Sequence, residues 1–203
     1  MKRLVLAALL AVPAASFAQS STWDIDSAHS HVSFTVKHMA VSNVRGEFQK
    51  VSGKIVLDEK DVSRSSVEAN IDPASINTRE PKRDAHLRSP DFFDVEKNKT
   101  LTFKSTKVEK AGDGKLKVTG DLTMNGVTKP VVLEVTGPTA PVKSPYGKTV
   151  RGIAATTTLD RKDFGLTWNR AIEAGPVVGD EVKVEIEAEL VKQDGPAPSG
   201  AAK

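Results

Sequence analysis

The side chains best suited to metal chemistry in this chain are its four histidines, two of which are separated by a single residue. His29 and His31 would share one face of an extended segment, because side chains alternate along a β-strand. Imidazole is a common ligand of zinc and copper, so the pair could bind a metal if His38 or His86 came close. No Asp or Glu is spaced to complete a catalytic zinc site. We therefore expect solvated or hydrogen-bonded histidines, with no metal and no cofactor.

Catalytic motifs are absent from the sequence. There is no Gly-x-Ser-x-Gly nucleophile motif, no phosphate-binding loop and no matched pair of nucleophile and base. The lack of cysteine rules out thiol catalysis and cysteine metal sites. Asp24 and Asp26 form a carboxylate pair, but such pairs are common where strands begin. We expect a binding protein and no enzyme, and an enzyme that uses a histidine as acid or base is the alternative.

The elements that must position these residues are mostly β-strands. Val32, Phe34 and Val36 alternate with polar residues, which predicts a strand with one buried face. Asn125-Gly126 is typical of a two-residue hairpin turn. The same alternation recurs at residues 51–58, 67–71, 101–108, 116–124, 131–135, 150–159 and, most regularly, 182–190.

One short helix is expected at Pro81 to Arg88, where good helix formers follow a proline in the first turn. Some eight antiparallel strands with hairpin links indicate an all-β, mainly antiparallel barrel or sandwich with this one inserted helix. A barrel of eight strands can hold one small ligand in its interior.

The N-terminus has the pattern of a secretory signal. Lys2 and Arg3 precede an apolar run from Leu4 to Val12, and Ser16-Phe17-Ala18 offers small residues for cleavage after Ala18. A retained membrane anchor is the alternative, although the run is shorter than the ~20 residues that span a bilayer. We expect a cleaved signal at 1–18, one barrel domain at 19–192 and a disordered tail at 193–203.

The overall charge gives no reason to expect a nucleic-acid partner. The full chain has 29 basic and 26 acidic residues, and loss of Lys2 and Arg3 would leave 27 basic residues against 26 acidic ones. Charges of both signs are interspersed, as on an ordinary solvated surface. We expect a soluble exported protein without stable membrane insertion. The sequence leaves open whether it forms a homodimer.

A set of motifs in a fixed order resembles the YceI-like family. The opening block is Trp23-x-Ile25-Asp26-x-x-His29-Ser30, followed by Val32-x-Phe34-x-Val36-x-His38 and Gly46-x-Phe48. The resemblance departs at Asn98-Lys99, where the family often has Tyr-Pro. Further matching blocks are Leu87-x-Ser89-Pro90-Asp91-Phe92-Phe93-Asp94, residues 122–131, Arg161-Lys-Asp-Phe-Gly165 and Val178-Gly-Asp-Glu-Val182.

This resemblance implies a lipocalin-like eight-stranded β-barrel in the bacterial periplasm. Members of the family hold long apolar chains inside the barrel, so the expected ligand is an isoprenoid, quinone-like or fatty-acid-like lipid, held for transport, storage or sequestration. An isoprenoid has few polar atoms, so its site needs a deep apolar tube. The candidates for the pocket wall are Phe34, Phe48, Phe92, Phe93, Leu101, Phe103, Leu122, Met124, Phe164 and Trp168.

Basic residues on the expected helix could contact the head group of such a lipid. Arg binds phosphate through paired hydrogen bonds. The alternative is a solvated helix face that Asp84 partly neutralises. A stress-related protein with a dry, side-chain-filled barrel is a further alternative for the whole chain. The head-group candidates are Arg79, Arg83, His86 and Arg88.

Overall fold

The structure is a computed structural model that describes residues 20–173 and 175–193. The predicted signal at 1–18 and the predicted tail beyond Gln193 lie outside the described residues. Among the described residues, no helix is long and apolar enough to cross a membrane.

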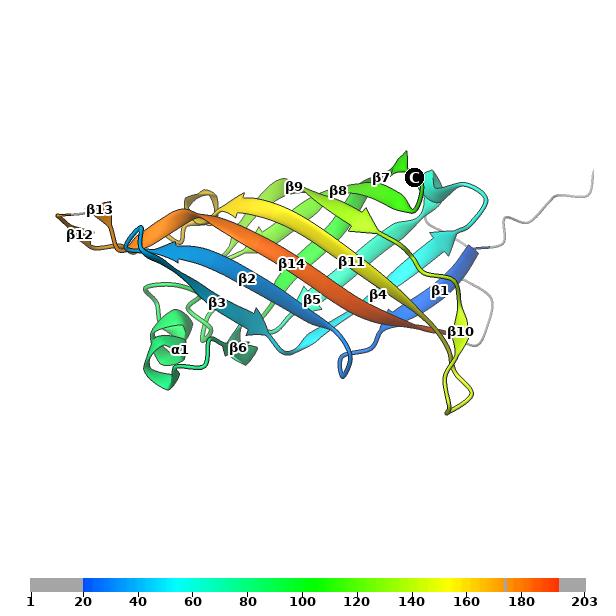
Figure 1. Ribbon diagram of the computed structural model, residues 1–203, viewed down its shortest axis with the longest axis horizontal. Helices are drawn as coiled ribbons and strands as arrows, with labels where there is room; N and C mark the ends of the chain where they lie inside the picture. The colour runs from blue at the N-terminus through cyan, green and yellow to red at the C-terminus, as the bar shows by residue number, and fades with distance from the viewer. Residues whose placement is uncertain (1–19, 174, 194–203) are drawn as a thin grey trace, which may run out of the picture.

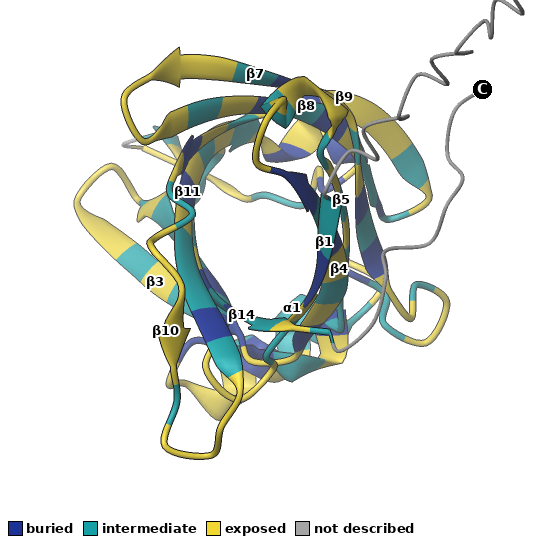
Figure 2. Cartoon of the chain, turned by 90° about the vertical axis from the view of Figure 1, so that its right-hand side faces the viewer, coloured by how far each residue is buried: buried dark blue, intermediate teal, exposed yellow. Residues whose placement is uncertain are grey.

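Eight antiparallel strands close a barrel (Figure 1). Around the barrel the order is β11–β9–β8–β7–β5–β4–β1–β14, and pairing of β14 with β11 closes the ring. Figure 2, a view along the barrel, shows the strands as a closed ring. The eight strands are β1 (Ser20–Ile25), β4 (Val51–Asp58), β5 (Ser66–Ile71), β7 (Leu101–Gly112), β8 (Lys115–Met124), β9 (Val127–Thr136), β11 (Thr149–Asp160) and β14 (Val178–Lys192).

Three further strands lengthen the barrel wall at one end. β2 (His31–His38) follows β1 along the same edge of β14, because β1 pairs with residues 190–192 and β2 with residues 178–187. β3 (Ser42–Phe48) pairs with β2 along its whole length, and β6 (Ile76–Asn77) pairs with the end of β3. These pairings make the barrel longer than β1 and β4 alone would allow.

The helix α1 (Pro81–Arg88) has the bounds that the sequence predicts. Glu80 caps it by accepting a hydrogen bond from the Lys82 amide, and Pro81 occupies the first turn, where its missing N–H costs nothing. The buried Asp84 carboxylate accepts a hydrogen bond from the Thr78 amide at 2.8 Å. This contact fixes α1 beside β6 (Figure 1).

The remaining elements are short connections. The hairpin turn predicted at Asn125-Gly126 is present between β8 and β9, with positive φ at both residues. The connection between β9 and β11 contains a two-residue strand that pairs with β11. The remaining short helices and strands are η1 (Val62–Arg64), η2 (Pro73–Ser75), β10 (Val142–Lys143), η3 (Arg161–Phe164), β12 (Ala171–Ile172) and β13 (Gly175–Pro176). The prediction of an all-β antiparallel barrel with one inserted helix is confirmed.

Candidate ligand-binding cavity

The barrel encloses a cavity of about 260 Å³. Its accessible wall is formed by apolar atoms, contributed by strands all around the ring. This wall follows from the period of two in the strands, which turns every second side chain inward. For scale, an engineered cavity of ~150 Å³ lined by apolar side chains takes up benzene. The cavity therefore has the size and chemistry to hold part of an apolar chain.

Eight of the ten wall candidates from the sequence line this cavity. They come from β2, β3, β7, β8 and the segment after α1. Phe48 packs between two other aromatic rings, with centroid distances of 5.8 Å to Phe34 and 5.4 Å to Phe93. Contact with a ligand stays a prediction for each of the eight, which are Phe34, Phe48, Phe92, Phe93, Leu101, Phe103, Leu122 and Met124.

The other two candidates do not line the cavity. Phe164 ends η3 and is 2% exposed, packed in the hydrophobic core. Trp168 is half-buried at one end of the barrel, where its ring packs against His86 at 4.7 Å and Phe92 at 5.3 Å. Phe164 lies in η3 and Trp168 in the irregular segment after it, and a strand pattern predicts the direction of neither side chain.

Aliphatic side chains of β11 and β14 form a second part of the wall that the sequence did not assign to the pocket. Val182, Val184 and Ile186 face inward from β14, and Ile153 and Leu159 face inward from β11. The alternation along residues 182–190 carried the signal, since it marks these side chains as inward-facing. It could not separate a wall that a ligand touches from a packed core, because both need the same apolar residues.

The inward-facing side chains of β14 become more buried from its start towards its end. Leu190 and Ala188 are buried, whereas Ile186, Val184 and Val182 are only half-buried although all five face inward. At the more buried end, Trp23 packs with Ile55, Leu57, Ala188 and Leu190 in a separate cluster. We infer from this gradient that the barrel is a cup whose mouth lies where β14 begins and β2 ends.

A buried arginine holds the loop at this mouth. Arg161 is only 4% exposed, and it donates hydrogen bonds to the carbonyl oxygens of Leu166, Trp168 at 2.9 Å and Gly179 at 2.9 Å. Its Nη2 also contacts the Asp180 carboxylate at 3.0 Å. The hydrogen bond from Lys162 is the main cause that holds the pKa of Asp180 below its usual value, and the charge of Arg161 adds to this effect. The positive charge of Arg161 therefore stabilises the loop whose carbonyl groups surround it.

Two head-group candidates are engaged by backbone carbonyls. Arg83 donates to the Thr78 hydroxyl at 2.8 Å and to the Thr78 carbonyl at 2.9 Å. Arg88 donates to the carbonyl oxygens of Ala74 at 2.9 Å and Ile76 at 2.5 Å. Both therefore tie α1 to the segment before it. The head-group role stays a prediction for these residues, beside this structural role.

The other two head-group candidates differ in their surroundings. His86 contacts Asp91 at 2.8 Å, and its ring packs edge-on against Phe92 at 5.1 Å. Phe92 lines the cavity, so His86 is separated from the interior by that ring. Arg79 is exposed at a turn with a φ of 65°. His86 also packs against Trp168 of the loop at the mouth, at 4.7 Å between ring centres, and the head-group role stays a prediction for His86 and Arg79.

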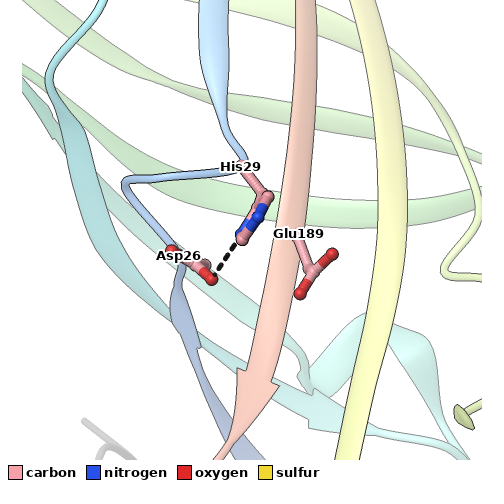
Figure 3. Close-up of side chains that lie close together, drawn as sticks. All are labelled: Asp26, His29 and Glu189. Carbon is pink, nitrogen blue, oxygen red and sulfur yellow. Dashed lines mark hydrogen bonds and ion pairs between the residues drawn. The ribbon is translucent and has the colours of Figure 1, made fainter. Parts of the chain in front are cut away.

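The histidines that the sequence singled out are held by different carboxylates. His29 lies in the turn between β1 and β2, where its Nδ1 contacts Asp26 at 2.9 Å, while His31 begins β2 and lies 3.9 Å from Glu187. Figure 3 shows His29 and Asp26 facing each other with Glu189 alongside. Potential ligand atoms of these three residues lie within 4.8 Å of one another. The hydrogen bond between His29 and Asp26 accounts for this arrangement without an ion.

This contact shifts both pKa values. The hydrogen bond to Asp26, followed by the charges of Asp26 and Glu189, raises the pKa of His29 above 6.5. The hydrogen bonds from His29 and from the Ala28 amide hold the pKa of Asp26 below 3.8. The pair therefore favours the charged forms of both groups, which suits an ion pair that fixes the turn against β14.

Comparison with known proteins decides the family. The family model for the YceI-like domain matches residues 23–190, which is nearly the whole barrel. The chain belongs to the YceI-like family. A UPF0312 protein of Vibrio cholerae is a YceI-like relative with 39% identity over 180 residues, which cover 89% of this chain and 93% of that protein. The resemblance expected from the ordered motifs is confirmed.

Solved structures agree with the YceI-like fold. A YceI protein of Campylobacter jejuni is similar at 33% identity with a TM-score of 0.66, over 78% of this chain and 90% of that one. A polyisoprenoid binding domain from Saccharophagus degradans, implicated in plant cell wall breakdown, has a TM-score of 0.60 over 84% of this chain and 98% of that one. At 17% identity, this second likeness shows the YceI-like fold alone.

Proposed function

We propose that this protein binds a long apolar lipid, such as an isoprenoid, a quinone-like or a fatty-acid-like chain, inside its barrel. The observation that carries the proposal is the apolar wall of the 260 Å³ cavity. Burial of apolar surface contributes about 25 cal/mol per Å², so such a wall gains affinity without directed polar groups. A lipid chain, which has almost no hydrogen-bonding groups of its own, matches this wall better than a polar metabolite.

The cavity argues against the dry-barrel alternative. A barrel filled by side chains packs at the density of an organic crystal and leaves few voids larger than a water molecule. Here Val182, Val184 and Ile186 are half-buried although they face inward. These apolar surfaces lack protein neighbours on one side, which is the situation that an apolar ligand corrects.

The same cavity gives little support to an enzyme that acts on a lipid. The titratable residues along its wall are His31, Arg161 and Glu187. Arg161 is surrounded by carbonyl acceptors, and His31 and Glu187 alternate with the inward-facing side chains of their strands. No group among the described wall residues is thus free to act as an acid or base on a chain in the cavity. A binding protein fits this arrangement.

A structural neighbour and the N-terminal sequence support a lipid-binding function in the periplasm. The Saccharophagus degradans domain with the same fold is described as polyisoprenoid binding. Residues 1–18 have the pattern of a secretory signal, which supports export to the periplasm, where apolar lipids need a carrier because they are insoluble in water. We propose transport or storage of such a lipid in the periplasm.

The proposal is tested by titrating the delipidated protein with a pyrenyl-labelled fatty acid. Trp23 forms part of the cavity wall, so a bound pyrene should accept energy from its indole. We expect saturable quenching of tryptophan fluorescence at about one probe per chain, with competition from unlabelled long-chain isoprenoids. Absence of saturable binding, in a protein that melts cooperatively, would reject the proposed function.

A further inference from the structure

Exposed apolar residues gather at the mouth of the barrel. Met39 and Val41 lie in the turn between β2 and β3, and Ile172 ends β12. Val41 is 79% exposed and Ile172 is 40% exposed, and Val142 and Tyr146 form a second exposed apolar pair in the loop before β11. Figure 1 shows both segments projecting beyond the barrel at the same end, on the left of the view. We call Met39, Val41 and Ile172 the apolar tip.

The two segments of the apolar tip are joined by the backbone. The Met39 amide donates a hydrogen bond to the Val177 carbonyl at 2.8 Å, and the Val177 amide donates to the Arg170 carbonyl at 3.0 Å. Positive φ values at Met39 and Ala40 turn the chain sharply at the tip. The apolar side chains therefore belong to one structured end of the molecule, held where they are exposed to solvent.

The apolar tip continues into the cavity wall. Val36, three residues before Met39, lines the cavity from β2, and Val178, next to Val177, lines it from β14. Val182 follows further along β14 and is half-buried at the same end. An apolar chain that leaves the cavity here meets apolar side chains from the interior to the outermost turn. At the opposite end, Trp23 and its neighbours close the barrel.

Cations surround the apolar tip. Lys37, Arg45 and Arg170 are exposed around it, and none of them forms an ion pair with another described residue. The guanidinium of Arg170 lies 5.9 Å from the centre of the Trp168 ring. Glu173 and Glu181 partly offset these charges, and Asp180 is paired with Arg161 and Lys162. The tip thus combines apolar side chains with a small excess of positive charge.

We propose that the apolar tip inserts into the surface of a lipid bilayer and that cargo passes between bilayer and cavity at this end. The inference rests on the proposed function for its cargo and on the tip for its docking. Apolar side chains flanked by cations are the pattern of segments that lie in the interface of a membrane. A bilayer is favoured as the partner because an insoluble lipid resides there, and the tip stands where the cavity opens.

Vesicle binding tests the docking directly. The protein as purified from its expressing cells is mixed with vesicles of phosphatidylcholine and phosphatidylglycerol at three to one, and the bound fraction is measured by flotation. The tip variant Val41→Asp with Ile172→Asp changes two exposed side chains, so folding should be unaffected. The matched control is Val142→Asp with Tyr146→Asp, which are 58% and 91% exposed in the wild type, at the loop that pairs with the other end of β11.

We expect the tip variant to lose at least fivefold in vesicle partitioning, while the control stays within twofold of the wild type. Partitioning should fall only modestly with added salt, because few net charges contribute. No vesicle binding by the wild type, or equal binding by the tip variant and the wild type, would overturn the docking proposal. A fivefold loss in the control instead would place docking at the opposite end and overturn it as well.

A loading assay separates this inference from the proposed function. The pyrenyl fatty acid is supplied either within donor vesicles or from a small volume of ethanol. We expect the tip variant to load at least fivefold more slowly from vesicles and at the wild-type rate from ethanol. Equal rates from vesicles would reject the role of the tip and leave the proposed function intact. Failure of the wild type to load by either route would reject the proposed function itself.

Discussion

The guanidinium of Arg151 lies 5.1 Å from the centre of the Trp23 ring, at the end of the barrel that is closed. Arg151 also contacts Glu59 at 2.8 Å, so the cation is held between a ring and a carboxylate. Trp23 is 2% exposed and forms the wall of the cavity at this end. A cation over an aromatic ring is favourable when partly desolvated. The pair therefore helps to close the end of the cup opposite its mouth.

Removing the Trp23 ring should destabilise the protein strongly. Truncation of a buried Trp to Ala typically costs about 3–5 kcal/mol, because lost burial adds to the cavity left behind. We predict a loss in this range for Trp23→Ala in urea unfolding, with a much smaller loss for Trp23→Phe, which keeps an aromatic ring. A loss below about 1 kcal/mol for Trp23→Ala would contradict the closed-end assignment.

A second prediction concerns the glycine beneath Phe103. A Cβ at Gly120 would lie 2.6 Å from the Lys104 carbonyl oxygen and closer still to the Phe103 ring, which lines the cavity. Overpacking of this kind costs about 1–3 kcal/mol. We predict a clear drop in the melting temperature of Gly120→Ala. Gly152→Ala is the control, since its Cβ would meet nothing nearer than Thr139 at 3.6 Å. Equal effects of the two changes would refute this explanation.

The strand alternation of residues 182–190 and the helix at Pro81–Arg88 could be read from the sequence, because both depend on neighbouring residues only. The surroundings of Arg161 could not. Nothing in the local sequence sets Arg161 apart from the exposed Lys162, yet Arg161 is buried and donates hydrogen bonds to carbonyl oxygens of residues 166–179. That contact depends on the path of an irregular loop.

Phe164 and Trp168 illustrate the same limit at the candidate site. The sequence marks them as apolar aromatics, but Phe164 lies in η3 and Trp168 in the irregular segment after it, where no strand period fixes their direction. The eight candidates that line the cavity lie on strands or next to α1, where the strand period or the close packing of Phe48 with Phe93 fixes their direction. The separation of wall from core needed the three-dimensional structure.

The pH dependence of stability should report on the turn between β1 and β2. The folded pKa of His29 is raised above 6.5, so its contribution is fully present below pH 6.5 and is lost as pH rises through the folded pKa. The folded pKa of Asp26 is lowered below 3.8, so its contribution is present above pH 3.8 and is lost as pH falls through the folded value. Stabilisation by the pair is greatest between these limits.

The measurement is the difference in melting temperature between the wild type and His29→Gln from pH 4 to pH 9. We predict that the difference is largest near pH 5 to 6 and shrinks towards pH 9. His31→Gln is the control, because His31 lies further from its carboxylate, at 3.9 Å from Glu187. A difference that grows steadily with rising pH would contradict the assigned ion pair.

A fourth prediction uses neighbouring residues that point to opposite sides of β14. Val184 lines the cavity, whereas Lys183 is exposed on the outer face. A carboxylate in an apolar tube is costly without a partner. We predict at least a tenfold loss of probe affinity in Val184→Glu and less than a twofold change in Lys183→Glu. Similar affinities in the two folded variants would show that the probe binds elsewhere.

Arg83→Ala separates the two roles proposed for the helix. A head-group role predicts weaker binding of a phosphorylated isoprenoid with no change for an uncharged one. The hydrogen bonds to Thr78 predict instead a lower melting temperature and the same small change for both ligands. We expect the second result, since two of the guanidinium nitrogens are engaged. Titration of both ligands against the same variant decides between the roles, and a selective loss would establish the head-group contact.

The most direct test of the central claim is mass spectrometry of organic extracts from the protein purified out of its native cells. We predict a long-chain isoprenoid, quinone-like or fatty-acid-like lipid at about one molecule per chain, and its loss from Val184→Glu purified in the same way. An extract without such a lipid, together with no uptake of added lipids by the folded protein, would contradict the claim that the barrel is a lipid container.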